Sequence, residues 1–144
     1  MRIISTQHGP NDFLIRVYDS KGKFRRAIYY PLQRKPLVRE EILSITAKDD
    51  WNRELLEHAE LPETWPVIYT VVPDDKNRLW VSTIVNEDEV FEWWVLSNTG
   101  KLIAKFNWPR SKPIEVIKNG YIYTRETEEE TELEQIVRYR FEIN

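Results

Sequence analysis

Two stretches of this sequence match each other without a gap. Residues 16–31 read RVYDSKGKFRRAIYYP, and residues 94–109 read WVLSNTGKLIAKFNWP. In both, an apolar run leads to a Gly-Lys pair, and a second run of alternating apolar residues ends at a proline. Alternation at a period of two around a glycine turn is typical of a β-hairpin. The chain therefore repeats one hairpin at an offset of 78 residues.

Shorter matches extend the repeat along the chain. Residues 4–6 match 81–83, residues 79–82 match 121–124 at an offset of 42, and residues 91–95 match 133–137. The unit is about 40 residues long and has four strands. Such a repeat predicts β-propeller blades, because a twisted four-stranded sheet cannot cover both faces alone and stacks on its neighbours. Large aromatic residues such as Trp80, Trp93 and Trp94 suit the layers between blades.

The repeat divides the chain into three blades and one insertion. The blades occupy residues 1–32, 66–109 and 113–144, and the insertion occupies residues 37–62. We expect strands two to four in the first blade, all four in the second, and strands one to three in the third. The four strands of the second blade are predicted at residues 66–73, 77–84, 90–97 and 101–108. The predicted fold is all-β, with about ten antiparallel strands arranged 3+4+3 in a single half-propeller domain.

The insertion has a different pattern from the blades. Residues 38–61 contain no Gly or Pro and are rich in Glu and Leu. The spacing of Trp51, Leu55, Leu56 and Ala59 places these residues on one face of a helix. We predict two short helices, at roughly 38–47 and 50–60, the second ended by Pro62.

Several segments together resemble one protein family. The runs DDKNRLWVST, FEWWVLSNTGKLIAKFNWPR, NGYIYTRE and IVRYRFEI resemble the C-terminal half of bacterial six-bladed β-propellers of the NHL/TolB-like kind, and VYDSKGKFRRAIYYP resembles the preceding blade. The resemblance covers most of the chain except the insertion. It implies an exported binding or scaffold protein, although some relatives are lyases or lactonases. The sequence has no catalytic motif to carry over from those enzymes.

Three blades are half of such a ring and leave open sheet faces and unpaired edges, which invite association. Two interpretations stay open: a half-propeller that closes its ring as a homodimer, or a piece of a longer chain completed by missing blades. The net charge is −3, but residues 1–39 sum to +7 and residues 114–144 to −4. A head-to-tail ring would therefore place a basic end beside an acidic one. We expect self-association.

A polar loop supplies the candidate ligand-binding residues. Asp74, Asp75, Asn77 and Arg78 lie between two predicted strands, and their oxygens could bind Ca²⁺. The simpler interpretation is an ordinary turn in which Asp and Asn bond to the local backbone. Asn119 begins the Asn-Gly pair of a predicted hairpin and is expected at the same inner ends of the blades.

Two charged runs favour solvent-exposed roles. Residues 126–134 carry six Glu among Thr, which predicts a solvated hairpin tip. A basic run has Phe24, Tyr29 and Tyr30 among it, and basic with aromatic residues is what single-stranded nucleic acid requires. The run consists of Lys21, Lys23, Arg25, Arg26, Arg34, Lys35 and Arg39. Strand alternation, however, puts Arg25 on the opposite face from Phe24 and Arg26, so the charges form no single patch. We predict no nucleic-acid partner.

Composition and motifs exclude several classes of protein. The chain has no cysteine and only two histidines, which excludes disulfide scaffolds, thiol nucleophiles and His-rich metal cages. No Ser–His–Asp pattern, phosphate-binding glycine loop or HExxH motif occurs. No apolar run approaches the roughly 20 residues of a membrane helix. We therefore predict no cofactor, no metal and no membrane span.

The function expected from the sequence is a non-enzymatic interaction or ligand-presenting module that associates with itself. The alternative is a propeller enzyme or small-molecule binder with its site at the central axis. The cellular compartment stays open, because the N-terminal residues lack the apolar core of a signal peptide while the resemblance includes exported proteins.

Overall fold

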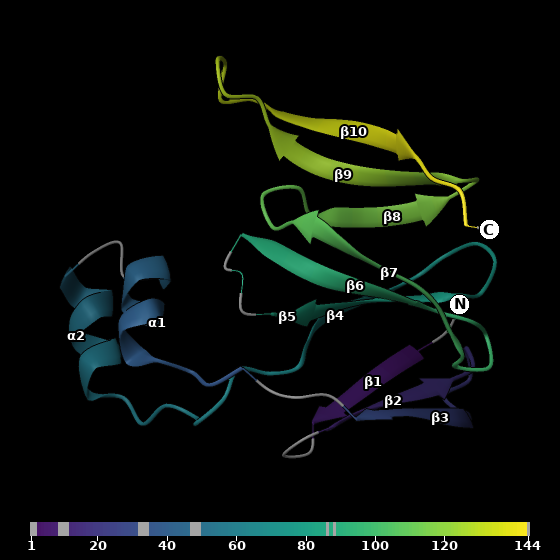
Figure 1. Ribbon diagram of the computed structural model, residues 1–144, viewed down its shortest axis with the longest axis horizontal. Coiled ribbons are helices and arrows are strands. Elements are labelled where there is room, and N and C mark those ends of the chain that lie inside the picture. Colours follow the sequence, from purple (N-terminus) through teal and green to yellow (C-terminus); the bar gives the residue numbers. More distant parts are fainter. Residues whose placement is uncertain are drawn as a thin grey trace.

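The computed structural model describes residues 3–8, 12–31, 35–46, 50–85, 87 and 89–143. Within these residues, ten strands form three antiparallel sheets that stack on one another (Figure 1). Sheet 1 has the order β1 (Ile3–His8), β2 (Asp12–Tyr18) and β3 (Phe24–Pro31). Sheet 2 has the order β4 (Ile68–Pro73), β5 (Leu79–Ile84), β6 (Val90–Leu96) and β7 (Leu102–Pro109). Sheet 3 has the order β8 (Ile114–Lys118), β9 (Tyr121–Thr127) and β10 (Glu134–Arg140). The predicted all-β class and the arrangement of three, four and three strands are confirmed.

Sheet 2 lies in the middle of the stack and is buried on both faces. One apolar cluster joins it to sheet 1 and includes Ile15, Val81 and Trp94. A second cluster joins it to sheet 3 and includes Trp80 and Trp93. The three tryptophans are at most 4% exposed. A continuous apolar run such as LWV in β5 is typical of a strand covered on both sides.

The insertion folds as a helical hairpin beside the sheets (Figure 1). It contains α1 (Arg39–Thr46) and α2 (Asp50–His58). The guanidinium of Arg39 donates hydrogen bonds to the carbonyls of Leu56, Glu57 and Ala59, and so satisfies carbonyls at the C-terminal end of α2. The predicted apolar face of α2 is covered only in part, since Trp51 is 70% and Leu55 52% exposed while Leu56 and Ala59 are half-buried. Neither described helix is long and apolar enough to cross a membrane.

The hairpins β2–β3 and β6–β7 share their irregularities. Each has a β-bulge at the corresponding place, between Val17 and Tyr18 in one and between Val95 and Leu96 in the other. The bulge leaves Arg25 as an extra residue, because Val17 lies opposite Arg26 and Tyr18 opposite Phe24. The expectation that Phe24 and Arg26 share a face is therefore wrong. Phe24 packs on Tyr18 of its own sheet, whereas the Arg26 guanidinium bonds to Asn98 of sheet 2.

The shorter sequence matches have offsets that differ from those given by the pairing of the strands. The Thr83 hydroxyl donates to the carbonyl of Glu92, and the Thr124 hydroxyl lies in the corresponding position, 3.4 Å from the carbonyl of Val137. These corresponding threonines are 41 residues apart, one fewer than the predicted offset of 42. Corresponding residues of β6 and β10 are 45 apart, three more than the predicted offset, so Trp94 matches Tyr139 rather than Ile136. A slip by an odd number of residues exchanges the two faces of a strand, so residues matched at an offset of 42 lie on opposite faces of their strands.

The match of residues 4–6 with 81–83 is also shifted by one. Thr6 lies opposite Ile15, and Ser82 lies opposite Trp93, which is the residue 78 positions after Ile15. Thr6 therefore corresponds to Ser82 rather than to Thr83.

Candidate functional site

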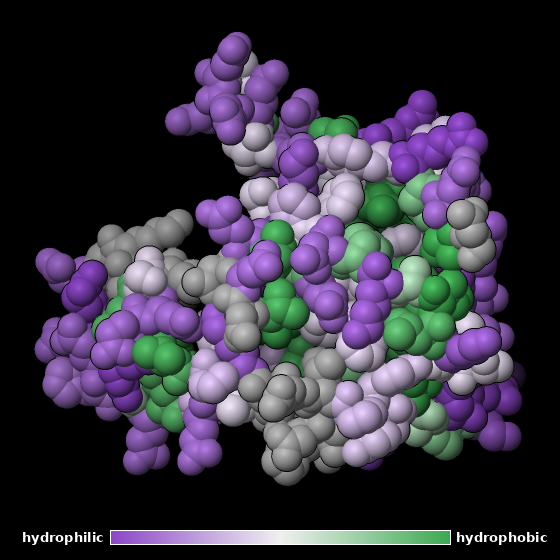
Figure 2. All heavy atoms as spheres, viewed as in Figure 1, coloured by the Kyte–Doolittle hydropathy of each residue, from purple (hydrophilic) through white to green (hydrophobic). Residues whose placement is uncertain are grey.

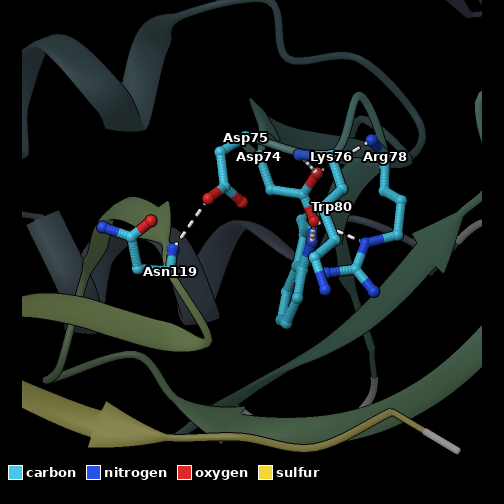
Figure 3. Close-up of polar contacts among 6 residues, drawn as sticks. All are labelled: Asp74, Asp75, Lys76, Arg78, Trp80 and Asn119. Carbon is cyan, nitrogen blue, oxygen red and sulfur yellow. Dashed lines mark hydrogen bonds and ion pairs between the residues drawn. The ribbon is translucent and has the colours of Figure 1, made fainter.

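The carboxylate of Asp74 organises the turn between β4 and β5. Its Oδ1 accepts hydrogen bonds from the backbone nitrogens of Lys76 and Arg78, each at 2.9 Å. Its Oδ2 accepts the Arg78 Nε–H at 2.6 Å and the Trp80 indole N–H at 3.0 Å (Figure 3). The residue is 8% exposed, and its carboxylate therefore serves four donors within this turn and the strand that follows.

The same contacts set the ionisation of Asp74. Burial alone would raise the pKa of this carboxyl group, but the hydrogen bonds from Trp80 and Arg78 and the positive charge of Arg78 outweigh it. The pKa of Asp74 therefore lies below its ordinary value. A carboxylate held ionised in this way is suited to fixing its donors in place rather than to transferring a proton near neutral pH.

Asp75 connects this turn to sheet 3. Its Oδ2 accepts the backbone N–H of Asn119 at 2.8 Å, across from the β4–β5 turn to the β8–β9 turn (Figure 3). Asn119 and Gly120 have φ angles of 55° and 77°, as the predicted Asn-Gly hairpin turn requires. Asn77 also has a positive φ, 61°, at the last corner of its own turn. The five candidate residues thus lie in two neighbouring turns, four of them in the first and Asn119 in the second.

The turn between β2 and β3 uses the same chemistry as the Asp74 turn. Asp19 accepts hydrogen bonds from the backbone nitrogens of Lys21 and Lys23, and its other oxygen pairs with the Arg25 guanidinium at 2.6 Å. The backbone hydrogen bonds, with that of Lys23 foremost, and the nearby Arg25 lower the pKa of Asp19 against the opposing effect of desolvation. In both turns the Asp carboxylate accepts the backbone N–H groups two and four residues later and pairs with an arginine, which is Arg25 for Asp19 and Arg78 for Asp74.

A cleft of about 630 Å³ lies between these two turns, where sheets 1 and 2 come together. Asp19, Arg25 and Arg26 line it from sheet 1, and Asp74, Asp75 and Asn77 line it from sheet 2. Arg25 and Arg26 belong to the basic run of the sequence, in which nothing indicates that they lie near the Asp74 turn. The bulge at Arg25 is the reason, because it decides which face each arginine occupies.

A second polar cluster, which the sequence analysis missed, lies between sheets 2 and 3. The Tyr139 hydroxyl donates to Glu126 Oε1 at 2.7 Å and accepts from Lys112 Nζ at 2.9 Å. The Thr124 hydroxyl donates to the same Glu126 oxygen at 2.8 Å. Desolvation opposes ionisation of Glu126, but the bonds from Tyr139 and Thr124 and the charge of Lys112 outweigh it and lower its pKa. The bond to Tyr139, with the nearby Glu126, raises the pKa of Lys112.

Glu126 therefore differs from the rest of the glutamate run to which the sequence assigned it. Its side chain is 15% exposed, whereas Glu128, Glu129, Glu130 and Glu132 are exposed in the turn between β9 and β10. The alternation of β9 gives the only sequence signal, since Ile122, Thr124 and Glu126 share one strand face. The predicted hairpin tip is correct only beyond β9.

The described residues include no group of three or more His, Asp or Glu side chains that could hold a metal ion. Comparison of the chain with protein-family models, with curated proteins and with solved structures returns no significant match. The resemblance to NHL/TolB-like propellers therefore rests on the sequence segments quoted above.

Proposed function

We propose that the chain is a non-enzymatic interaction module of the propeller type, in which each sheet is one blade and a second copy covers the outer blades. The observation that carries this proposal is a contact that recurs from one sheet to the next. Tyr30 of β3 meets Trp94 of sheet 2 edge to face, with ring centroids 5.4 Å apart. Trp108 of β7 meets Tyr139 of sheet 3 in the same way at 5.1 Å.

The residues of the two contacts hold corresponding places in their sheets. Tyr30 and Trp108 are 78 residues apart, the same offset that relates the hairpins β2–β3 and β6–β7. Trp94 and Tyr139 are both on the face turned toward the preceding sheet. Because each sheet packs on the next through the same aromatic contact, further sheets can pack in the same way at either end of the stack, which supports additional blades.

The outer faces of the stack carry exposed apolar residues. The outer face of sheet 1, which carries Tyr18, Phe24 and Tyr29, leaves Phe24 52% and Tyr29 61% exposed. The outer face of sheet 3, which carries Val116 and Ile136, leaves them 49% and 67% exposed. These faces lie at opposite ends of the stack (Figure 1). Exposed apolar residues on an open sheet face favour association.

The charges of the two outer sheets are complementary. Residues 12–31 of sheet 1 contain five basic and two acidic residues, and residues 114–143 of sheet 3 contain four basic and eight acidic residues. A head-to-tail pair of copies therefore brings a sheet with an excess of three positive charges to one with an excess of four negative charges. Such complementarity orients the partners and speeds their encounter. Two copies placed in this way supply six blades.

Light scattering coupled to size-exclusion chromatography tests this proposal. We expect a mass of about twice 17.4 kDa that falls toward 17.4 kDa on dilution. Tyr29→Asp, on the outer face of sheet 1, is expected to shift the chain to the monomer. Leu55→Asp is the matched control, because Leu55 is similarly exposed but lies on α2. A mass of 17.4 kDa at every concentration contradicts the proposal.

The contacts in the cleft beside Asp74 do not favour a second function. Its arginines are already bonded within the chain, Arg25 to Asp19 and Arg26 to Asn98. Asp74 likewise serves four donors of its own turn and strand. These bonds support a structural role for the cleft residues, in which Asp19 and Asp74 hold their own turns and Arg26 joins sheet 1 to the β6–β7 turn of sheet 2.

A further inference from the structure

Sheet 3 is one strand shorter than sheet 2 on the side of β10. In sheet 2 the order continues from β6 to β7, whereas β10, the counterpart of β6, pairs only with β9 among the described strands. One edge of β10 therefore has backbone N–H and C=O groups with no strand beside them. An unpaired strand edge is a template for an added strand.

The missing strand also leaves part of β7 without a cover. The equivalent contact between sheets 1 and 2 shows what such a cover consists of. There Ile28 of β3 packs on Gly100, and the Tyr30 hydroxyl donates to the Gly100 carbonyl at 2.6 Å. Gly100 belongs to the turn that begins β7. The residues of β7 that correspond to Ile28 and Tyr30 are Phe106 and Trp108. No counterpart of Gly100 covers them in the described part of sheet 3.

A groove of about 310 Å³ occupies this place. Ala104, Phe106 and Trp108 line it from β7, and Tyr139 and Phe141 line it from the end of sheet 3. The five residues are partly buried and belong to the apolar cluster between sheets 2 and 3. The groove is thus an open continuation of an interface that exists within the chain. Figure 2 shows hydrophobic residues gathered at the right of this face, near the C-terminal end.

We infer that this groove and the β10 edge bind an extended segment of another protein, which adds to sheet 3 as a fourth, antiparallel strand. Its backbone pairs with β10, and alternate apolar side chains enter the groove against Phe106 and Trp108. The ligand class is therefore a peptide strand with one apolar face. The site lies at the edge and inner side of sheet 3, so it does not use the outer faces proposed for self-association.

The charges beside β10 fix the direction and the ends of such a ligand. A strand antiparallel to β10 begins beside Arg140 and ends beside Glu134. Beyond Glu134 lies the turn that carries Glu128, Glu129, Glu130 and Glu132, and this turn projects from the body as a hydrophilic tip (Figure 2). A basic residue at the C-terminal end of the ligand therefore meets a cluster of carboxylates. In sheet 2 the corresponding place is taken by Arg110, whose Nε donates to the carbonyl of Val90 at β6.

A synthetic peptide of alternating Val and Thr that ends in two arginines tests the inference. We expect it to bind in fluorescence anisotropy at low salt. The reversed peptide, with both arginines at its N-terminus, is expected to bind about tenfold more weakly, because its charges then lie beside Arg140. A third peptide with proline at its centre is expected not to bind, because proline cannot donate to the ladder. Equal binding of all three peptides overturns the inference.

Two measurements on the protein distinguish peptide binding at this groove from peptide binding at another surface. Ala104→Arg fills the groove and is expected to weaken binding at least about tenfold, while Asn107→Arg, on the opposite face of the same strand, leaves binding unchanged. On the unaltered chain, hydrogen exchange of alternate β10 amides is expected to slow when peptide is added. Unchanged exchange in β10 at saturating peptide contradicts the inference, whether or not the Ala104→Arg variant folds.

Discussion

The ring of Tyr30 meets the indole ring of Trp94 edge to face, with centroids 5.4 Å apart and planes at 88°. One sheet further along the stack, Trp108 meets Tyr139 at 5.1 Å and 84°. In both contacts the edge strand of one sheet supplies a ring to the following sheet. These aromatic residues of the edge strands therefore hold neighbouring sheets together.

Tyr30→Ala is expected to loosen sheet 1 from sheet 2. Loss of the half-buried ring and of its hydroxyl bond to Gly100 is expected to lower the free energy of unfolding by about 2–4 kcal/mol. Leu55→Ala is the control, because its side chain is 52% exposed on α2, away from the contact between sheets 1 and 2 and from both outer faces, and we expect less than about 1 kcal/mol. Urea unfolding measures both. Equal losses for the two variants contradict the proposed contact.

Two glycines at corresponding turns are expected to differ in their tolerance of alanine. Gly22 and Gly100 both have positive φ, so either substitution strains the backbone by about 1–2 kcal/mol. At Gly100 an added Cβ would also lie 3.0 Å from Ile28 Cγ1, whereas at Gly22 it would meet no atom within 4 Å. Gly100→Ala is therefore expected to lower the thermal midpoint further than Gly22→Ala. The reverse order would show that sheet 1 does not pack on the β6–β7 turn.

Two buried tryptophans are expected to respond differently to phenylalanine. Trp80 donates its indole N–H to Asp74, and Trp80→Phe leaves that carboxylate without one of its donors. The indole N–H of Trp93 is buried and has no hydrogen-bond partner among the described residues. We expect Trp80→Phe to cost about 1–3 kcal/mol more than Trp93→Phe in free energy of unfolding. Chemical denaturation followed by circular dichroism gives the comparison.

Asp74→Asn is expected to alter the acid stability of the fold. The pKa of Asp74 is lowered on folding, so its carboxylate stabilises the fold above its unfolded pKa of about 3.9, and that contribution is lost as the pH falls through the folded pKa. The variant is expected to lose about 2–3 kcal/mol at pH 7, and the difference from the original chain is expected to shrink below about pH 4.

Asp75→Asn is the control for that titration. Asp75 accepts one backbone N–H from Asn119 and is exposed, and an amide oxygen can accept the same bond. We expect a loss below about 1 kcal/mol. Unfolding in urea at pH 7, 4 and 3 measures both variants. A constant difference between the Asp74→Asn variant and the original chain at all three values contradicts the assigned role.

Hairpins and strand number could be predicted from the sequence because they depend on local signals. The period-two runs, the Gly-Lys turns and the Asn119-Gly120 pair all indicate structure within a few residues. The bulge at Arg25 could not be predicted, because the extra residue leaves the sequence pattern intact while it reverses the face of Phe24. The offset of 41 between β5 and β9 was missed for a similar reason, since apolar residues on both faces of β5 fit either register.

The candidate site was partly predictable. The loop from Asp74 to Arg78 was identified as polar, and the interpretation as an ordinary turn accounts for the bonds from Asp74 to the backbone of Lys76 and Arg78. The bond from Asp75 to Asn119 joins residues 44 positions apart, and no local pattern relates them. The groove beside β10 arises because sheet 3 lacks a counterpart of β7, and this difference becomes visible only when the strand pairing of sheets 2 and 3 is compared.

Mixing two variants, each with a substitution on a different outer face, tests most directly whether the two outer faces bind each other. Tyr29→Asp alters the outer face of sheet 1, and Ile136→Asp alters the outer face of sheet 3. We expect each variant alone to have the mass of one chain in light scattering. An equimolar mixture is expected to form a dimer, because one of its two interfaces then joins two intact faces. A mixture that stays monomeric while the original chain dimerises would contradict a head-to-tail ring, and a monomeric original chain would contradict self-association altogether.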